Sequence, residues 1–501
     1  MSEDGANATH DGARGDRRVL IAAAAATVAI AILLLVRFPW IVGPPSWRWP
    51  YVATSLWPRA LGTTLLFALL AGAAATWTRR RDSRPRGDAA MLALVVLIAI
   101  ALELSFLGLS PLGPVTLPLI HVVPWVTGYF WTARSVTSLP EMLTSFHEIV
   151  AGLPHHARTH PPGLVAVNHQ ILEFFRGSAG ATDGVLGVAR AFGISEGDLP
   201  GAAPAELASL IIVGLAVVIC SRLALIPAFF FARRLSGAPA ARAAVLLLAV
   251  IPSHLLFAGE FDAAYPLLIL AAFLLVGRGR GLRSLVAAGA LCGVLCLFTF
   301  VASFFLLLVG IVDITITRFA RADDAGTRPP PRWRLRRLLA LGAGFASVLA
   351  LFQLATGCSI PRVFLAAYKI QHEVLIPEQR REWLTWVFWN LPDFFIFLGP
   401  AVAVLFAREV FAAVRDLRAR RIEAPFTLAV LAFLAVLDLS GLIPAETSRV
   451  WLFLVAPVVI AATRGGVPGG TRGLIAILAL QFAFSLVAKG SLLMIDVKLP
   501  G

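Results

Sequence analysis

A short run near the middle of the chain, Arg158-Thr-His-Pro-Pro-Gly163, combines side chains that could bind an oxyanion with a signal for the start of a helix. Proline is tolerated in the first turn of a helix, so the two prolines predict a helix that begins here, with Thr159 as a candidate N-cap. The N-terminal end of a helix attracts anions, and Arg158 and His160 would add donors for a phosphate or a sugar hydroxyl. We therefore expect Arg158, Thr159 and His160 to bind substrate.

The segment that follows, residues 164–175, predicts a helix at the membrane surface. Its apolar residues form a broad face with polar positions between them, and the segment is too short to span a bilayer. One alternative is a capped interfacial helix without chemistry. Another is a zinc site made by His156, His160 and His169, although no carboxylate or cysteine completes a familiar set of zinc ligands.

Other ionisable residues are expected to gather near the outer ends of apolar runs, where they are costly and therefore suggest a function. The pair Glu260 and Asp262 could act as a base or as ligands of a divalent metal, or it could complement the dipole of the helix that follows. Arg449, three residues after Glu446, could pair with that acid, bind a lipid phosphate or anchor the interface. The further candidates for substrate binding are His254, Asp393 and Asp438.

The composition indicates which elements must position these side chains. The chain is 58% hydrophobic and only 14% charged, whereas about a quarter of the residues of a soluble protein are charged. Only helices are plausible for such long apolar runs in lipid, so we predict an all-α, polytopic membrane protein with about thirteen transmembrane helices. The predicted spans are residues 19–42, 57–77, 89–110, 207–231, 239–257, 260–277, 282–298, 300–318, 338–357, 385–411, 425–443, 448–463 and 473–490.

The arginines predict which loops face the cytoplasm. The net charge of +14 does not indicate nucleic acid, because the arginines lie in short loops beside apolar runs, as the positive-inside rule describes. Their clusters at 79–86, 321–337 and 415–421 are expected inside, which places the long loop 111–206 outside. We expect a bacterial plasma-membrane protein with a cytoplasmic N-terminus and an extracytoplasmic C-terminus. Arg222, within a span, is expected to pair with an acid.

The same pattern predicts how the chain is divided. The expected parts are a disordered cytoplasmic tail (1–18), N-terminal transmembrane helices (19–88), a module with the large outer loop (89–318), a basic cytoplasmic linker (319–337) and C-terminal transmembrane helices (338–501).

Four motifs together resemble the GT-C membrane glycosyltransferases, in particular actinobacterial-type relatives of the mannosyl and aminoarabinosyl transferases. They are Arg158-Thr-His-Pro-Pro-Gly163, Asn390-Leu-Pro-Asp-Phe-Phe395, Asp438-Leu-Ser-Gly441 and Glu446-Thr-Ser-Arg-Val-Trp-Leu-Phe453. The resemblance covers roughly residues 90–465. It implies a multi-helix enzyme that takes a sugar from a polyprenyl-phosphate carrier and transfers it to an extracytoplasmic acceptor by single displacement with inversion.

The resemblance also implies an acid on the first large outer loop that serves as base or metal ligand. The stretch 128–134 contains no Asp or Glu; the nearest loop acids are Glu141 and Glu148, and Glu260 or Asp262 is the alternative. The departure leaves open a catalytically inactive scaffold of the same fold. A transporter or flippase of a lipid-linked or amphipathic solute is a further alternative, but it should show paired repeats and ionisable groups at mid-membrane. Because no repeat is evident, we favour the enzyme, with membrane lipids, donor and acceptor as partners and no certain cofactor.

Overall fold

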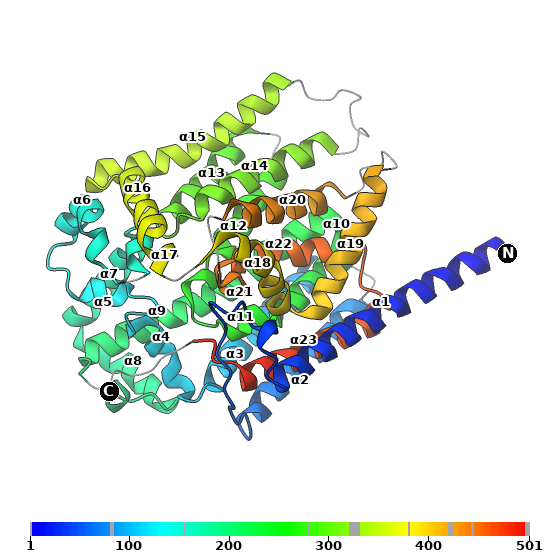
Figure 1. Cartoon of the computed structure of the whole chain (residues 1–501), viewed down its shortest axis with the longest axis horizontal. Helices are drawn as coiled ribbons and strands as arrows, with labels where there is room; N and C mark the ends of the chain where they lie inside the picture. Colours follow the sequence, from blue (N-terminus) through cyan, green and yellow to red (C-terminus); the bar gives the residue numbers. More distant parts are fainter. Residues whose placement is uncertain are drawn as a thin grey trace.

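The structure, a computed structural model, consists of helices joined by short connections (Figure 1). It describes residues 3–80, 85–154, 156–199, 201–278, 281–319, 331–378, 381–418, 424–441 and 445–495. Among these residues the secondary structure is helical apart from one isolated bridge between Tyr51 and Leu492. The predicted all-α class is therefore confirmed.

Long apolar helices form the main body of the molecule. They are α1 (Glu3–Leu35), α2 (Ala60–Arg79), α3 (Pro85–Gly108), α9 (Pro204–Leu223), α10 (Leu225–Ala249), α15 (Pro331–Thr356) and α23 (Gly470–Ser491). Shorter apolar helices complete it: α12 (Pro266–Arg278), α13 (Leu282–Cys296), α14 (Ala302–Phe319), α18 (Trp383–Leu398), α19 (Pro400–Arg418), α20 (Pro425–Ser440) and α22 (Leu452–Ala462).

A second set of short helices lies in the loop 111–206 and between the apolar helices. They are α4 (Thr116–Val122), α5 (Tyr129–Arg134), α6 (Leu139–Ile149), α7 (Gly163–Gly177), α8 (Ala179–Ala191), α11 (Pro252–Leu256), α16 (Ile360–Ile370), α17 (Ile376–Glu378) and α21 (Thr447–Val450). A π-helical turn, Gln371–Leu375, joins α16 to α17.

The number of single membrane-crossing helices is lower than predicted. Among the described residues, six helices are long and apolar enough to cross a bilayer when the run Pro204–Leu256 (α9 to α11) is counted as one helix. The number is up to seven if the bent pair α18–α19 is one span, so the prediction of thirteen is not confirmed. Glycines account for part of the difference. Gly399 (φ 98°) joins α18 to α19 at a bend of 113°, within the predicted span 385–411. Gly237 (φ 83°) interrupts α10 between the predicted spans 207–231 and 239–257, where a break is expected.

Two predictions concern polar segments outside the bundle. The segment expected to be a disordered tail is helical from Glu3 onward and continues directly into the first span. Residues 320–330 of the expected basic linker lie outside the described residues, and α15 begins at Pro331.

Buried ion pairs tie the apolar helices together. Arg222 on α9 pairs with Glu103 on α3, and both side chains are almost completely buried, which confirms that this arginine has an acidic partner. On the other side of the bundle, Arg337 of α15 pairs with Asp313 of α14. Removing one partner from such a pair would leave an uncompensated buried charge, so each pair disfavours arrangements that separate its two helices.

Helices α13 and α15 pack with their backbones almost in contact. A Cβ atom on Gly289 would collide with the carbonyl of Leu341, and one on Gly344 would collide with the carbonyl of Val286. Small residues permit this close approach in membrane helices. Most of α15 is otherwise exposed on the outside of the bundle, where it runs along the upper edge in Figure 1.

Exposed tryptophans mark one end of the bundle. They lie in or beside the loops predicted to face outward: Trp40, Trp57, Trp125, Trp131 and Trp383. Tryptophan is enriched where hydrocarbon meets water, so these side chains indicate the level of one membrane interface.

Candidate functional site

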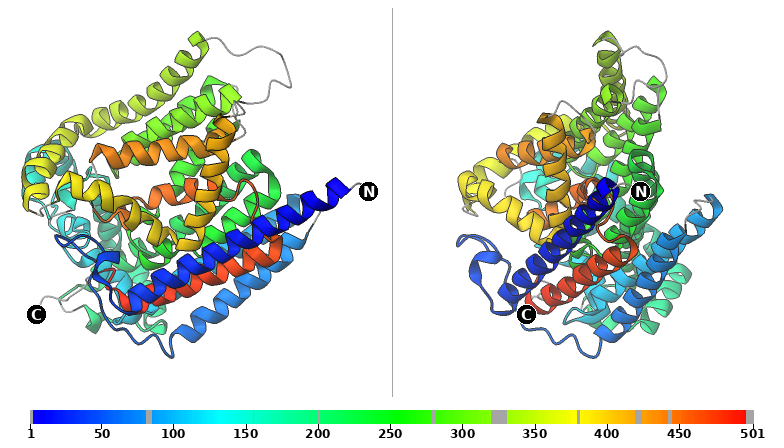
Figure 2. Two further views of the ribbon diagram at one scale, coloured as in Figure 1. Left: turned by 45° about the vertical axis from the view of Figure 1, so that its right-hand side comes forward. Right: turned by 90° about the vertical axis from the view of Figure 1, so that its right-hand side faces the viewer.

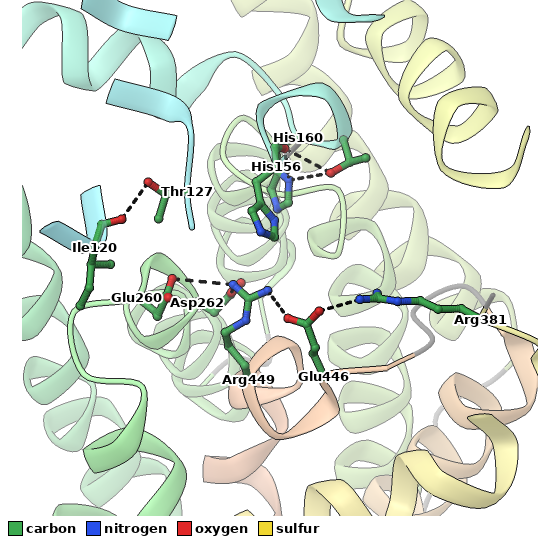
Figure 3. A network of polar contacts seen from close by, with 10 residues as sticks. Ile120, Thr127, His156, His160, Glu260, Asp262, Arg381, Glu446 and Arg449 are labelled. Carbon is green, nitrogen blue, oxygen red and sulfur yellow. Dashed lines mark hydrogen bonds and ion pairs between the residues drawn. The ribbon is translucent and has the colours of Figure 1, made fainter. Parts of the chain in front are cut away.

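One cavity of about 210 Å³ brings together half of the predicted site residues. Its polar lining comes from residues 156–160, from the turn before α12 and from the turn at α21, which converge in Figure 3. The predicted residues that line it are Thr159, His160, Glu260, Asp262, Glu446 and Arg449. Residues more than 280 positions apart in sequence, such as Thr159 and Arg449, therefore share one site.

Arg449 is the centre of a cluster of charges within the cavity. Its Nη2 donates to Oε2 of Glu446 at 2.7 Å, and its Nη1 lies 3.7 Å from Glu260 Oε2 and 3.9 Å from Asp262 Oδ2. Nη2 of Arg381 donates to the other oxygen of Glu446 at 2.6 Å. Three carboxylates thus face two guanidinium groups (Figure 3).

The acids of this cluster differ in protonation. Burial alone would raise the pKa of Glu446, but Arg449 and Arg381, with His156, lower it to about 2. Burial raises the pKa of Glu260 to about 7, because the more distant Arg449 offsets only part of the effect of desolvation. The negative charges of Asp262 and Glu446 raise this pKa further. Glu446 is therefore always ionised near neutral pH, whereas Glu260 is poised to exchange a proton.

The turn that carries Glu446 and Arg449 is held by Asp393 on α18. Oδ2 of Asp393 accepts from the backbone N–H of Ser448 at 2.8 Å and from Thr447 Oγ1 at 3.0 Å, and Trp49 Nε1 donates to Oδ1 at 2.9 Å. Glu446 has a φ of 53°, a left-handed conformation that non-glycine residues rarely adopt. Such local strain persists only where surrounding contacts maintain it. Asp393 therefore positions the turn and does not line the cavity itself.

Asp438 and Asn390 support the same turn from behind. Nδ2 of Asn390 donates to Asp438 Oδ1 at 3.1 Å, and Oδ1 of Asn390 accepts from the N–H of Ala445 at 3.2 Å. The motifs that begin at Asn390, Asp438 and Glu446 therefore form one structural unit. Asp438, like Asp393, contributes through the shape of the turn and not through the cavity wall.

The run 158–163 is divided between the cavity and the protein interior. His160 lines the cavity, its ring packs edge-on against Tyr129 and its Nδ1 lies 2.9 Å from the carbonyl oxygen of His156. That carbonyl can only accept, so Nδ1 carries the proton and Nε2 is the basic nitrogen of the neutral ring. Arg158 does not line the cavity; its Nε donates to the Leu153 carbonyl at 3.0 Å.

The expected helix start differs from the structure. Thr159 does not cap α7: it ends a 3₁₀ turn, and its Oγ1 donates to the carbonyl of His156. The residue before the helix is Pro162, which provides no capping side chain. The N–H of Gly163 donates to the Leu297 carbonyl at 2.9 Å, so the first donor of the helix is already used by the protein. The anion site predicted at this terminus is therefore not formed in the expected way.

Gly163 is required by this contact, which gives a first testable prediction. A Cβ atom at this position would collide with the Leu297 carbonyl. We expect Gly163→Ala to destabilise the purified protein by about 1–3 kcal/mol, measured as a lower midpoint of thermal unfolding in detergent. Gly177→Ala, at the open end of the same helix, is the control and should change stability little. Equal midpoints for the two variants would contradict the close packing.

Three predicted residues lie away from the cavity. Glu141 and Glu148 are exposed on α6, and Glu148 approaches only the ring of His147, at 3.8 Å. His254 is buried in α11, with Nδ1 3.3 Å from Ser221 Oγ and next to the Arg222–Glu103 pair. These three residues were predicted because they lie in or near the expected outer loops, but the fold places their side chains outside the cavity.

The cavity also has an aromatic wall that sequence reasoning missed. Phe300 lies just before α14 and Phe304 lies in its first turn, and Phe364 and Tyr368 come from α16. The Phe300–Phe364 and Phe364–Tyr368 rings are 5.3 and 6.1 Å apart. Phe364 and Tyr368 are 38% and 45% exposed, so this wall reaches the outer surface of the bundle. The regular spacing of apolar residues in 360–370 was the available signal.

The residues present do not fit a divalent metal. Glu260 and Asp262 both face the guanidinium group of Arg449, which occupies the place of a cation. No group of three His, Cys, Asp or Glu side chains suited to a metal ion occurs among the described residues. The three histidines considered for zinc do not form such a group: His169 is buried on α7, with Nδ1 3.2 Å from the Ala133 carbonyl.

Comparisons with known proteins give structural neighbours only. No family model matches the chain, and no curated protein sequence matches it. The fold is similar to oligosaccharyltransferase of Archaeoglobus fulgidus in complex with zinc and sulfate (TM-score 0.38, 13% identity, 79% of this chain and 53% of that chain) and in the apo form (0.41, 12%, 80% and 56%). It is also similar to AglB of the same archaeon in complex with an inhibitory peptide and a dolichol-phosphate (0.35, 14%, 74% and 50%).

The chain thus spans about half the length of these oligosaccharyltransferases. At these identities and TM-scores the similarity assigns neither donor nor acceptor. None of the three is a mannosyl or aminoarabinosyl transferase, so that closer resemblance stays a prediction. The apolar helices themselves identify the chain as a multi-pass membrane protein.

Proposed function

We propose that this protein is a membrane glycosyltransferase that moves a sugar from a polyprenyl-phosphate carrier to an acceptor on the outer face of a bacterial plasma membrane. One observation carries the proposal: a single cavity joins a buried cluster of acids and guanidinium groups to an aromatic wall that reaches the outer surface of the bundle. A donor with a charged head and an oily chain needs both environments at once.

The geometry suits such a donor because exposed tryptophans adjoin the cavity. Trp125 directly precedes Val126, and Trp383 follows Arg381 by two residues; Val126 and Arg381 both line the cavity. Trp49, in the same N-terminal loop as exposed Trp40, contacts Asp393, which holds the Arg449 turn. The isoprenoid chain would lie along Phe304, Phe364 and Tyr368 and leave sideways into lipid. Its phosphate would meet the guanidinium group of Arg449, which offers a planar set of donors.

The proposed reaction is a single displacement. An acceptor hydroxyl attacks the anomeric carbon, the bond from that carbon to the carrier's phosphate oxygen breaks, and the carrier phosphate leaves with the electron pair. The hydroxyl proton passes to a carboxylate of the protein. Arg449 stabilises the charge that develops on the departing phosphate, an effect that is large where water is excluded.

Glu260 is the acid best suited to accept that proton. A general base works best when its pKa is close to the working pH. Glu260, with a pKa near 7, meets this condition, whereas Glu446, with a pKa near 2, holds a proton too weakly. We therefore assign Glu446 to orienting Arg449, and Asp262 to the electrostatic environment of Glu260.

A donor panel with purified protein tests the proposal. Synthetic polyprenyl-phosphate sugars are incubated with wild-type protein in detergent micelles, and loss of donor is followed by mass spectrometry. We expect consumption of at least one donor and none in Tyr368→Ala/Phe364→Ala protein, which lacks the two rings that α16 contributes to the aromatic wall. The single variant Tyr368→Phe is the control. Transport of intact donor across vesicles without sugar loss would replace the enzyme with a flippase.

A further inference from the structure

A second groove lies at the opposite end of the molecule from the candidate site, between α1 and α19. These helices pack along one another, and Figure 2 shows α1 beside α23 on the same face. The groove begins near Arg18, at the start of the first span. From residue 18 to Leu35 the helix rises roughly 25 Å, nearly the thickness of a bilayer's hydrocarbon core. Its far end leads to the loop with Trp49, which reaches the candidate site.

Glu409, the acid that lines this groove, is neutralised within the protein. It accepts from Arg408 at 2.7 Å and lies 3.5 Å from Arg464, and Arg408 also donates to the Gly466 carbonyl. The Glu409 carboxylate is therefore not available to balance the charges on the groove's rim.

The rim itself is basic. Arg18 on α1 and Arg415 on α19 line the groove and are exposed. The Arg415 side chain is 80% exposed, and its Nε lies 3.8 Å from Asp416 Oδ1, too far for a direct hydrogen bond. Two exposed guanidinium groups on facing helices can bind one phosphate group from both sides.

Below the rim the groove is apolar. Val19 and Ala22 line it from α1, and Val404 and Phe411 line it from α19. The Phe411 ring is 76% exposed on the bundle, which fits a position in contact with an acyl chain. A basic rim over an apolar wall at a helix end is complementary to a phospholipid with a negatively charged head group.

We propose that the α1–α19 groove is a binding site for an anionic phospholipid of the leaflet opposite the candidate active site. The head-group phosphate lies between Arg18 and Arg415, and an acyl chain lies along Val19, Val404 and Phe411. The site is independent of sugar transfer, because no residue that lines it lines the other cavity.

Lipid binding by the full-length protein tests this site. Purified protein in detergent is titrated with phosphatidylglycerol, phosphatidylcholine or inorganic phosphate, and bound lipid is counted by native mass spectrometry. We expect phosphatidylglycerol to bind to wild type, and Arg18→Gln/Arg415→Gln to weaken this binding by about tenfold or more, since each basic residue contributes several-fold near a lipid surface. Arg283→Gln, an exposed arginine at the start of α13, is the matched control and should bind as wild type does.

A second variant addresses the acyl chain without altering charge. Phe411→Ala should also weaken phosphatidylglycerol binding, whereas Phe388→Ala, at a 70% exposed ring on α18, should not. Equal binding of phosphatidylglycerol by wild type and the double arginine variant would overturn the proposal. So would equal binding of phosphatidylcholine, or displacement of the lipid by millimolar inorganic phosphate, which would identify a simple anion site.

Discussion

Replacement of Glu260 by glutamine is expected to lower kcat for sugar transfer by a factor of about 10²–10⁴, the usual contribution of a general base. Glutamine keeps the shape of the side chain but cannot accept the acceptor's proton. Because Glu260 lies 3.7 Å from Arg449, a distance too long for a direct hydrogen bond, the turn at Arg449 should stay in place. Donor binding, measured separately by isothermal calorimetry, should therefore change little.

The pH profile distinguishes a catalytic role of Glu260 from a structural one. Burial raises the pKa of this carboxyl to about 7, so the basic form is lost as the pH falls below that value. We expect kcat/KM of wild type to be level above pH 7 and to fall about tenfold per pH unit below it. The residual activity of Glu260→Gln should lack this limb.

Asp262→Asn is the matched control for that profile. The negative charge of Asp262 raises the pKa of Glu260, so its removal should move the acidic limb of kcat/KM to lower pH while the limb remains. A wild-type rate and an unchanged profile in Glu260→Gln would remove Glu260 from the mechanism. Loss of the limb in Asp262→Asn alone would transfer the role to Asp262.

Arg449→Ala is expected to lower kcat by about 10²–10³, as does the loss of a group that stabilises charge in the transition state. The substitution leaves Glu260, Asp262 and Glu446 together with Arg381 as the nearest guanidinium group. Repulsion among the acids should also weaken binding of the phosphate donor. Steady-state kinetics with purified protein would measure both effects.

Two further variants test this prediction: Arg449→Lys keeps the charge, and Arg176→Ala is a control outside the cavity. Lysine retains the charge but not the planar pair of donors, so its rate should lie between those of wild type and alanine. Arg176 is exposed on α7 and pairs with Glu173 at 2.7 Å, and its loss should leave kcat unchanged. A wild-type rate in Arg449→Ala would place the donor's phosphate elsewhere.

Much of the polar part of the site could be predicted from the sequence, because ionisable residues are costly in a membrane and are therefore rare there unless they have a function. Glu260, Asp262, Glu446 and Arg449 were expected near the outer ends of apolar runs, and the cavity unites them. Their distances could not be predicted, since each depends on how helices far apart in the chain pack.

Several predicted residues lie outside the cavity wall for a common physical reason. Asp393 and Asp438 were expected to bind substrate, but their carboxylates satisfy backbone and side-chain donors of the fold. An acid that contacts substrate and an acid that supports a turn are identical in sequence, because the difference lies in which donor reaches the carboxylate. For the same reason Arg158, although beside His160, donates to a backbone carbonyl and leaves the cavity to its neighbour.

The spans show the same limit. Hydropathy located the apolar runs, but it does not report where a glycine with positive φ bends a run into two helices, as at Gly399. The aromatic wall could not be predicted in the same way. Phe364 and Tyr368 lie on an amphipathic helix between the predicted spans 338–357 and 385–411, where hydropathy alone predicts a loop.

The glycine contacts between α13 and α15 have a consequence for genetics. Helix α16, which carries Phe364 and Tyr368, begins only a few residues after α15 ends at Thr356. Helix α15 in turn packs on the bundle mainly through the close backbone contacts at Gly289 and Gly344. A bulkier residue at either glycine would push α15 away from α13 and displace the part of the aromatic wall that α16 carries. Random mutagenesis for inactive alleles should therefore recover these glycines. Because each clash is with a backbone carbonyl, a smaller side chain at the facing positions Val286 and Leu341 should not compensate.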